Sequence, residues 1–239
     1  MKDAALRAVL LDVGNTLRHL DYAWIADALR ARGRPTSAHD VQVAEYGAKA
    51  AIDCAFAARE ATGQAIWPDA VRRYSYFALL LAEVGIAPDD AEPLIDALEA
   101  ENRDHCLWRV TEANAVEVLT ALRARGFALA VVSNADGRVE TDLVRAGLRP
   151  LLDVVIDSHV VGVEKPDPAI FRFALDRLGV TPAAAIHVGD IASIDVAGAR
   201  RTGMGPVLID PLGRYPGTFE CPRISRLAEL LDLLPTRAA

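Results

Sequence analysis

Acidic, hydroxyl and basic side chains follow four short apolar segments of the chain. Asp12 ends "AVLLD", Ser133 and Asn134 end "LAVVSN", Lys165 lies in "VGVEKPDP", and Asp190 ends "AIHVGD". Carboxylate oxygens are the ligands that Mg2+ prefers in proteins. A lysine supplies a compact positive charge that offsets the repulsion between a carboxylate and a phosphate. These residue types therefore suit magnesium-assisted chemistry on a phosphate group, provided that the fold brings them together.

Taken singly, each of these residues has an ordinary structural interpretation. An aspartate at a strand end is commonly a turn residue, and a serine before a helix commonly caps it. A lysine before a proline commonly faces solvent. The order of the four groups along the chain is more informative than any one of them.

The elements that must position these residues can be read from the hydrophobic periodicity. Strands are expected at 7–13, 127–134, 151–158, 184–190 and 205–210. Helices are expected at 113–126, 138–148, 167–179, 193–203 and 224–234. This alternation predicts a parallel sheet with crossover helices. Ligands of such sheets bind at the carboxyl ends of the strands, so the four polar groups should meet at one edge.

A long helical segment interrupts the alternation after the first strand. Residues 20–107 carry almost no strand pattern and predict helices at 22–32, 38–61, 69–84 and 90–104. The predicted fold is α/β: a Rossmann-like, doubly wound parallel sheet core with an inserted α-helical domain. The core comprises residues 1–19 and 108–239, and the insert comprises residues 20–107.

Composition excludes several classes of protein. The 239 residues are 52% hydrophobic and carry a formal charge of -7, which argues against binding nucleic acid through its phosphates. No apolar run reaches the roughly 18 residues of a membrane span, and the first apolar stretch is too short for the core of a signal peptide. The three cysteines form no CxxC pair and fit reduced thiols. We expect a cytoplasmic monomer or homodimer that binds neither nucleic acid nor membrane.

Four motifs together resemble those of the haloacid dehalogenase (HAD) superfamily of hydrolases, most of which are phosphatases. The motifs are "LLDVGNTL", "VVSNAD", "VGVEKPDPAIF" and "HVGDIASIDVAGAR", in this order. The resemblance covers the core, and the insert lies where that superfamily carries its helical C1-type cap. It implies a Mg2+-dependent hydrolase that acts on a small phosphorylated metabolite selected by the cap.

The resemblance also implies a role for each polar residue around the phosphate. Asp12 would be the nucleophile that becomes an aspartyl phosphate. Ser133 and the backbone N–H of Asn134 would bind the phosphoryl oxygens, and Lys165 would neutralise charge between Asp12 and the phosphate. Thr16 would hold the loop through its hydroxyl group.

The Mg2+ ligands implied by the resemblance come from the first and last motifs. They are the Asp12 carboxylate, the backbone carbonyl of Gly14 and the Asp190 carboxylate. Asp195 would support the metal through water or a hydrogen bond. Asn15 tolerates a left-handed backbone, so Gly14 and Asn15 can form a tight turn after Asp12.

One position departs from the pattern of the superfamily. Most of its phosphatases have a second aspartate two residues after the nucleophile, which serves as general acid and base, whereas this chain has Gly14. A phosphatase could still act on substrates with good leaving groups, such as acyl phosphates, or take its proton from elsewhere. His19 has the most suitable ordinary pKa for that task, although a solvated histidine between the two domains is the simpler interpretation.

Three other functions stay open. The 2-haloacid dehalogenases of the superfamily also lack the second aspartate, but they usually lack the glycine–aspartate pair present here at Gly189 and Asp190. Phosphonate hydrolases use a cap lysine as a Schiff base, and Lys49 is the lysine of this insert. The third alternative is a catalytically impaired binding or regulatory protein.

Overall fold

The computed structural model describes residues 6–62, 72–216 and 220–234. The chain divides into two compact units. The core unit comprises Met1–His19, Thr111–Gly213 and Gly217–Ala239. The helical unit comprises Leu20–Val110 and Arg214–Pro216.

Short strands alternate with helices along the core unit. The strands are β1 (Ala8–Leu11), β2 (Arg18–His19), β3 (Val110–Thr111), β4 (Ala128–Ser133), β5 (Val154–Asp157), β6 (Ala185–Gly189), β7 (Gly205–Ile209) and β8 (Arg223–Ile224). The core helices are α5 (Ala115–Ala124), α6 (Val139–Arg145), α7 (Ser158–Val161), α8 (Pro168–Leu178), α9 (Ala197–Thr202) and α10 (Leu230–Leu233).

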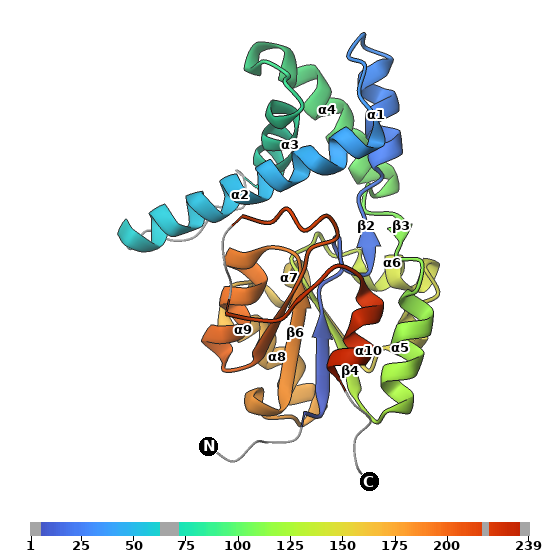
Figure 1. Cartoon of the computed structure of the whole chain (residues 1–239), viewed down its shortest axis with the longest axis vertical. Helices are drawn as coiled ribbons and strands as arrows, with labels where there is room; N and C mark the ends of the chain where they lie inside the picture. The colour runs from blue at the N-terminus through green and yellow to red at the C-terminus, as the bar shows by residue number, and fades with distance from the viewer. Residues whose placement is uncertain (1–5, 63–71, 217–219, 235–239) are drawn as a thin grey trace. The chain divides into compact units, whose positions relative to one another are not determined.

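Six strands form one parallel sheet in the order β5-β4-β1-β6-β7-β8. The chain runs outward from β1 to one side through β4 and β5, and to the other through β6, β7 and β8 (Figure 1). This is the doubly wound arrangement that the sequence predicts. Its switch point, where ligands bind in such folds, lies at the carboxyl ends of β1, β4 and β6.

The sheet is buried on both faces, as parallel sheets are. Val9 and Leu11 of β1 belong to one apolar cluster, which contains side chains of α5, α6 and α10. Ala8 and Leu10, which alternate with them, belong to a second cluster with side chains of α8 and α9. Helices therefore cover each face of the sheet and hold the strands that carry the polar residues at their ends (Figure 1).

Several expected element boundaries are corrected. The helix expected at 224–234 begins instead with β8, followed by a 3-10 turn at Leu227–Glu229 and the short α10. The N–H of Asp210 donates to the carbonyl of Ile224 at 2.8 Å, so sheet pairing outweighs the helical periodicity there. The helix expected at 193–203 begins with a π-helical turn at Ala192–Val196. β2 and β3, which form a separate two-stranded sheet, are not predicted by the sequence.

Within its described residues, the helical unit contains four helices near the four expected ranges. They are α1 (Tyr22–Arg30), α2 (Ala38–Thr62), α3 (Arg72–Glu83) and α4 (Pro88–His105). The start of the helix expected at 69–84 lies outside the described residues, which resume at Arg72. Leucine, isoleucine and phenylalanine side chains from α1, α3 and α4 form the core of this unit.

Residues 108–110, which the sequence analysis places in the core, lie in the helical unit. The ring of Trp108 lies 5.4 Å from that of Tyr76, between ring centroids. Arg109 forms ion pairs with Asp21 at 2.9 Å and with Glu101 at 2.5 Å. These contacts within the helical unit explain the shifted boundary.

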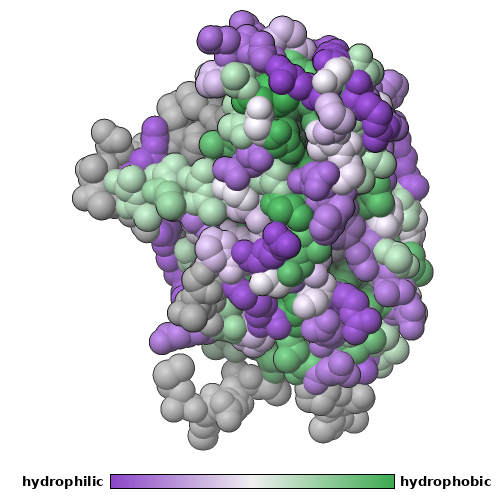
Figure 2. Space-filling view, turned by 45° about the horizontal axis from the view of Figure 1, so that its top comes forward, coloured by the Kyte–Doolittle hydropathy of each residue, from purple (hydrophilic) through white to green (hydrophobic). Residues whose placement is uncertain are grey.

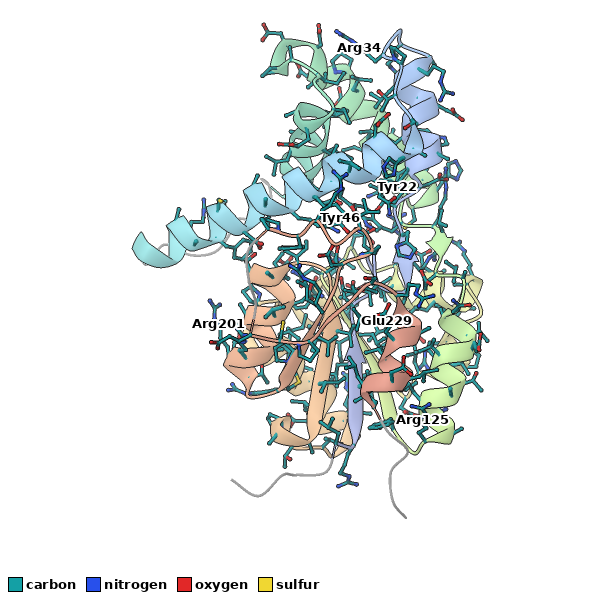
Figure 3. All side chains as sticks on the ribbon, viewed as in Figure 1. Tyr22, Arg34, Tyr46, Arg125, Arg201 and Glu229 are labelled. Carbon is teal, nitrogen blue, oxygen red and sulfur yellow. The ribbon has the colours of Figure 1, made fainter. Side chains whose placement is uncertain are left out.

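A buried polar cluster lies inside the helical unit. Lys49 Nζ lies 3.3 Å from Glu45 Oε2, and both side chains are almost fully buried. The hydroxyl groups of Tyr22 and Tyr76 also donate to Glu45. Tyr22 comes from α1 and Tyr46, whose ring contacts Lys49, comes from α2 (Figure 3). Because Glu45 compensates the buried ammonium group, Lys49 has a structural role in this unit.

Apolar side chains on the surface are scattered. On the face shown in Figure 2, hydrophilic residues are interspersed with small apolar areas. The exposed large apolar residues, among them Val144, Val160 and Phe173, belong to different elements. Among residues 6–62, 72–216 and 220–234, no helix is both long enough and apolar enough to cross a membrane.

Candidate active site

The loop after β1 is held by its own backbone. The N–H of Asp12 donates to the carbonyl of Val188 at 2.9 Å, which extends the pairing of β1 with β6. The carbonyl of Val13 accepts from Arg18 at 2.8 Å, and the N–H of Asn15 donates to the carbonyl of Arg18 at 2.7 Å. Asn15 has φ 50°, so the expected left-handed tight turn is present.

Lys165 is the centre of the site. Its Nζ lies 2.7 Å from Asp12 Oδ1 and 2.8 Å from Asp195 Oδ1, and its side chain is 2% exposed. Its backbone is held by the side chain of Asn134, which accepts from Lys165 N at 2.7 Å and donates to Lys165 O at 3.0 Å. The residue that follows β4 therefore fixes the lysine in front of the carboxylate that follows β1.

Asp195 lies in the π-helical turn and accepts four hydrogen bonds. Oδ1 accepts from Lys165 Nζ at 2.8 Å and from His187 Nε2 at 2.9 Å. Oδ2 accepts from the backbone N–H groups of Asp190 at 3.1 Å and Ile191 at 3.0 Å. A carboxylate offers about four acceptor positions. Asp195 thus uses its acceptors to hold the lysine and the loop that carries Asp190.

Three carboxylates converge beside the lysine. Ligand oxygens of Asp12, Asp190 and Asp195 all lie within 4.8 Å of one another, and all three residues are buried. Asn15 Nδ2 donates to Asp190 Oδ2 at 3.2 Å, which orients that carboxylate. With one ammonium group for three carboxylates, the ionised cluster carries an excess of two negative charges. A divalent cation with a preference for oxygen ligands fits this donor set.

Burial and charge shift the pKa values of these groups. Burial raises the pKa of Asp12 to about 7, against the opposing effect of Lys165. Burial works in the same direction on Asp195, but Lys165 and the hydrogen bond from His187 hold its pKa below the ordinary range. Burial lowers the pKa of His187. Of Asp12 and Asp195, Asp12 is therefore the carboxylate whose charge the surrounding groups compensate less.

Thr16 does not make the contact that the sequence analysis assigns to it. The residue is fully buried, but within the described part of the chain its hydroxyl group has no hydrogen-bond partner. Backbone hydrogen bonds to Val13 hold the loop instead. Ser133 ends β4 and is 5% exposed, at the switch point where it was expected.

Gly189 is required by the position of Asp195. A Cβ atom added to Gly189 would lie 2.2 Å from Asp195 Cγ, so any side chain would displace the carboxylate. In the sequence Gly189 is recognisable only as part of a motif, and the steric reason for it is visible only in the structure. His187 was not among the residues expected at the site, and the one sequence signal for it is a polar residue inside the otherwise apolar "AAIHVG".

His19 is not a solvated residue, contrary to the simpler sequence interpretation. His19 Nε2 lies 2.6 Å from Glu112 Oε2, and the two side chains are 19% and 20% exposed. His19 ends β2 and Glu112 follows β3, so the small two-stranded sheet brings them together. A histidine paired with a carboxylate is a common arrangement in proton transfer.

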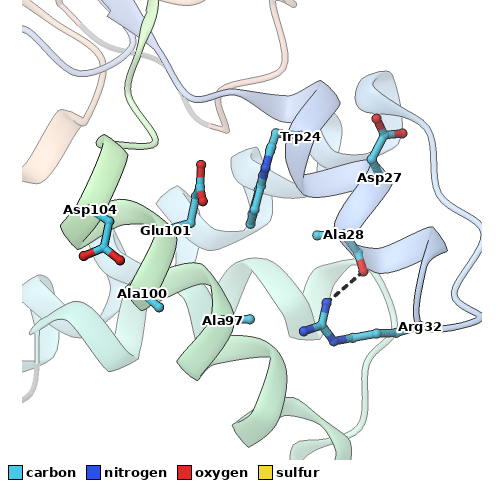
Figure 4. A pocket seen from close by; sticks show the side chains of 8 residues that line it. All are labelled: Trp24, Asp27, Ala28, Arg32, Ala97, Ala100, Glu101 and Asp104. Carbon is cyan, nitrogen blue, oxygen red and sulfur yellow. Dashed lines mark hydrogen bonds between the residues drawn. The ribbon is translucent and has the colours of Figure 1, made fainter.

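A pocket of about 450 Å³ lies within the helical unit, between α1 and α4. It is lined by Trp24, Asp27, Ala28, Arg32, Ala97, Ala100, Glu101 and Asp104 (Figure 4). The guanidinium of Arg32 is held by the carbonyl of Ala28 at 3.2 Å. The lining includes none of the candidate catalytic residues.

The loop after β1 separates this protein from dinucleotide-binding members of the same fold class. Those proteins have a glycine-rich phosphate loop there, whereas in this chain the loop carries Asp12, which forms an ion pair with buried Lys165. The fold and site thus define a doubly wound α/β protein with a buried carboxylate–lysine centre. A family model described as haloacid dehalogenase-like hydrolase matches residues 6–203, and the chain belongs to that family.

Known proteins of several activities are similar to the chain. Haloacid dehalogenase-like hydrolase domain-containing protein 3 of Mus musculus is 41% identical over 150 residues, 59% of either chain, so the match spans about three fifths of that relative. Phosphoserine phosphatase of Thermus thermophilus is 36% identical over 167 residues, which cover 70% of this chain and 65% of that protein. A solved dehalogenase with an intermediate complex aligns with TM-score 0.66 and 25% identity, over 98% and 99% of the two chains.

Proposed function

We propose that this chain is a Mg2+-dependent phosphatase that acts on a small phosphorylated metabolite through an aspartyl phosphate on Asp12. The observation that carries the proposal is the Asp12–Lys165–Asp195 arrangement, with the Lys165 ammonium 2.7 Å from the Asp12 carboxylate. The similarity to a phosphoserine phosphatase supports phosphate chemistry. The helical unit, inserted between β2 and β3, is proposed as the substrate-selecting cap.

Asp12 and Asp190 are the proposed side-chain ligands of Mg2+, together with the backbone carbonyl of Gly14. The donor set fits a hard divalent cation, which would supply Lewis-acid polarisation of a phosphoryl oxygen. Asp195 is not a proposed direct ligand of Mg2+, because its oxygens already accept from Lys165, His187 and two backbone N–H groups. Its role is to hold Asp190 and Lys165 in place.

The proposed reaction has two steps on Asp12. A carboxylate oxygen of Asp12 attacks phosphorus, the bond from phosphorus to the leaving oxygen breaks, and that oxygen takes a proton. Water then attacks phosphorus of the aspartyl phosphate, which releases inorganic phosphate and restores the carboxylate. Lys165 offsets the charge between Asp12 and the phosphoryl group, and Ser133 and the Asn134 N–H bind phosphoryl oxygens.

The test is a screen for phosphate release by the full chain, with Mg2+ and with EDTA. Phosphoserine, sugar phosphates and acyl phosphates form the panel. We expect turnover of at least one substrate and a fall of at least about 10²-fold on removal of the metal. The proposal is wrong if no substrate releases phosphate; the dehalogenase, phosphonate hydrolase and binding or regulatory alternatives then remain.

A dehalogenase is the second candidate, favoured by Gly14 and by the similarity to a solved dehalogenase. Chloride release from 2-chloropropionate without metal would support it. Borohydride trapping of a phosphonate substrate on Lys49 tests the phosphonate hydrolase alternative. Its pairing with Glu45 at 3.3 Å argues for a structural Lys49, so we expect no trapping.

His19 is the proposed source of the proton that Gly14 cannot supply. We expect His19→Gln to slow hydrolysis of alkyl phosphates by about 10²-fold while acyl phosphates change by no more than about threefold, because a general acid matters most for poor leaving groups. Steady-state kinetics over a series of leaving groups measure this dependence. Equal effects on all substrates would assign His19 a structural role.

Gly14→Asp in the His19→Gln background is the matched rescue. Gly14 does not have the positive φ that would require glycine. The added carboxyl group should restore hydrolysis of alkyl phosphates and leave acyl phosphates unchanged. Failure of the rescue, with the metal still bound, would contradict the view that only proton transfer is missing.

A further inference from the structure

His187 is a buried histidine inside β6 whose side chain the proposed reaction does not use. It is 1% exposed, and its neighbours in the strand, Ile186 and Val188, are apolar. Its ring packs edge-on against Phe171 at 4.9 Å between centroids. A polar ring at such a position costs free energy unless it makes a hydrogen bond, so its contacts need a physical explanation.

The hydrogen bond of His187 is made to Asp195. Nε2 lies 2.9 Å from Asp195 Oδ1. An ionised carboxylate only accepts, so Nε2 carries the hydrogen whether or not the ring is charged. The same oxygen accepts from Lys165 Nζ at 2.8 Å. His187 therefore fixes the oxygen that positions the lysine.

The other oxygen of Asp195 is held by the loop after β6. It accepts from the N–H groups of Asp190 and Ile191 at 3.1 Å and 3.0 Å. A carboxylate is rigid, so fixing one oxygen also fixes the direction of the other. Without the His187 donor, Asp195 keeps the Lys165 and two backbone N–H donors, so Oδ1 would be oriented from its own side by the lysine that it positions. His187 is the donor to Oδ1 that is independent of that lysine.

We propose that His187 is a positioning residue that orients the Asp195 carboxylate and, through it, the Lys165 ammonium and the loop that carries Asp190. It does not touch the substrate. The kinetic consequence rests on the proposed phosphatase function. The hydrogen bond itself is measurable without any substrate.

The kinetic test compares His187→Leu with His187→Gln. Leucine fills the space but has no donor, whereas the glutamine side-chain amide can place N–H near the position of Nε2. We expect His187→Leu to lower kcat by about 10- to 100-fold, with a smaller change in KM, as is typical for groups that orient a metal site. His187→Gln should recover most of this loss.

Phe171→Leu is the matched packing control, because it removes the ring against which His187 packs but keeps the donor. A purely structural role of His187 would lower the melting temperature in both leucine variants and leave kcat of the folded protein unchanged. That pattern, or equal kcat losses for His187→Leu and His187→Gln at equal stability, would overturn the proposal.

Nitrogen-15 NMR of the five histidines reads the hydrogen bond directly. The His187 signal is identified by its loss in His187→Gln. We expect hydrogen on Nε2 that is protected from exchange, and a loss of this protection in Asp195→Ala, which has no acceptor. A ring with hydrogen on Nδ1 alone would overturn the proposal. If the wild type hydrolyses no phosphate ester, the proposed function fails, and the NMR result still decides the role of His187.

Discussion

Asp12→Asn is expected to abolish phosphate release, by at least about 10⁴-fold in kcat, because removal of a catalytic nucleophile has effects of this size or larger. The amide keeps the shape of the side chain but cannot form the aspartyl phosphate. Stopped turnovers of the wild type should yield phosphorylated protein with the label on Asp12, located by mass spectrometry. If Asp12→Asn released phosphate at the wild-type rate, the reaction through an aspartyl phosphate on Asp12 would be ruled out.

The melting temperature of Asp12→Asn shows whether its loss of activity comes from the missing nucleophile or from unfolding. Burial raises the pKa of Asp12 to about 7, above its ordinary value of 3.8. The folded protein thus binds this proton more tightly than the unfolded chain does, so ionised Asp12 destabilises the metal-free fold. This cost is absent well below pH 4 and complete above pH 7. At pH 8 in EDTA, Asp12→Asn should melt at the same temperature as the wild type or higher.

Asp157→Asn is the matched control for this substitution. Asp157 is also a buried aspartate at the carboxyl end of a strand, and it caps α7 by accepting from His159 N at 2.9 Å. Asparagine keeps an oxygen that can accept this hydrogen bond and is as good an N-cap as aspartate, so the replacement should change stability little and leave kcat within about threefold of the wild type. A large kcat loss in Asp157→Asn would show that any polar change at this sheet edge is damaging.

Lys165→Met is expected to lower kcat by about 10³-fold, the scale seen when one group that stabilises transition-state charge is removed. The same substitution leaves Asp12 and Asp195 without their shared ammonium group. Breaking a buried ion pair by removing one partner costs about 3 kcal/mol or more of the free energy of unfolding. Kinetics should be measured well below the melting temperature, with folding checked by circular dichroism.

Lys49→Met is the matched control, since the chain has a second buried lysine paired with a carboxylate. Lys49 is 3% exposed and lies 3.3 Å from Glu45. Its loss should also destabilise the protein, because buried Glu45 loses its cationic partner and keeps only the hydrogen bonds from Tyr22 and Tyr76. We expect little change in kcat. Loss of turnover in Lys49→Met, with turnover retained in Lys165→Met, would reverse the assigned roles and favour the Schiff-base alternative.

The sequence predicts the sheet well because its signals are local. Each main strand is a run of apolar residues ended by a turn or polar residue, as in "FALAVVSN", and each crossover helix has its own periodicity. The two-residue strands β2, β3 and β8 carry no such signal, since their pairing depends on residues distant in the chain. The helix expected at 224–234 starts later than expected for the same reason: β8 includes Ile224, and the helical turns begin at Leu227.

In the candidate site, too, the sequence predicts some features and not others. The residue types and their places at strand ends were sufficient to select Asp12, Ser133, Lys165 and Asp190, because a doubly wound sheet gathers its strand ends at one switch point. Thr16 shows the limit of this reasoning. Its motif position implies a hydroxyl contact, yet the backbone holds the loop and the hydroxyl has no hydrogen-bond partner in the described part of the chain.

By itself, then, the sequence determined the α/β core, the helical insertion and the order of the polar groups. Only the tertiary structure decided which donors meet which acceptors. It brings four donors to the Asp195 carboxylate, bonds the Asn134 side-chain amide to the backbone of Lys165, and pairs His19 with Glu112. The physical reason is that hydrogen bonds require positions fixed to within a fraction of an ångström. Periodicity along a chain places a residue on a strand or a helix, whereas such precision arises from the packing of several elements at once.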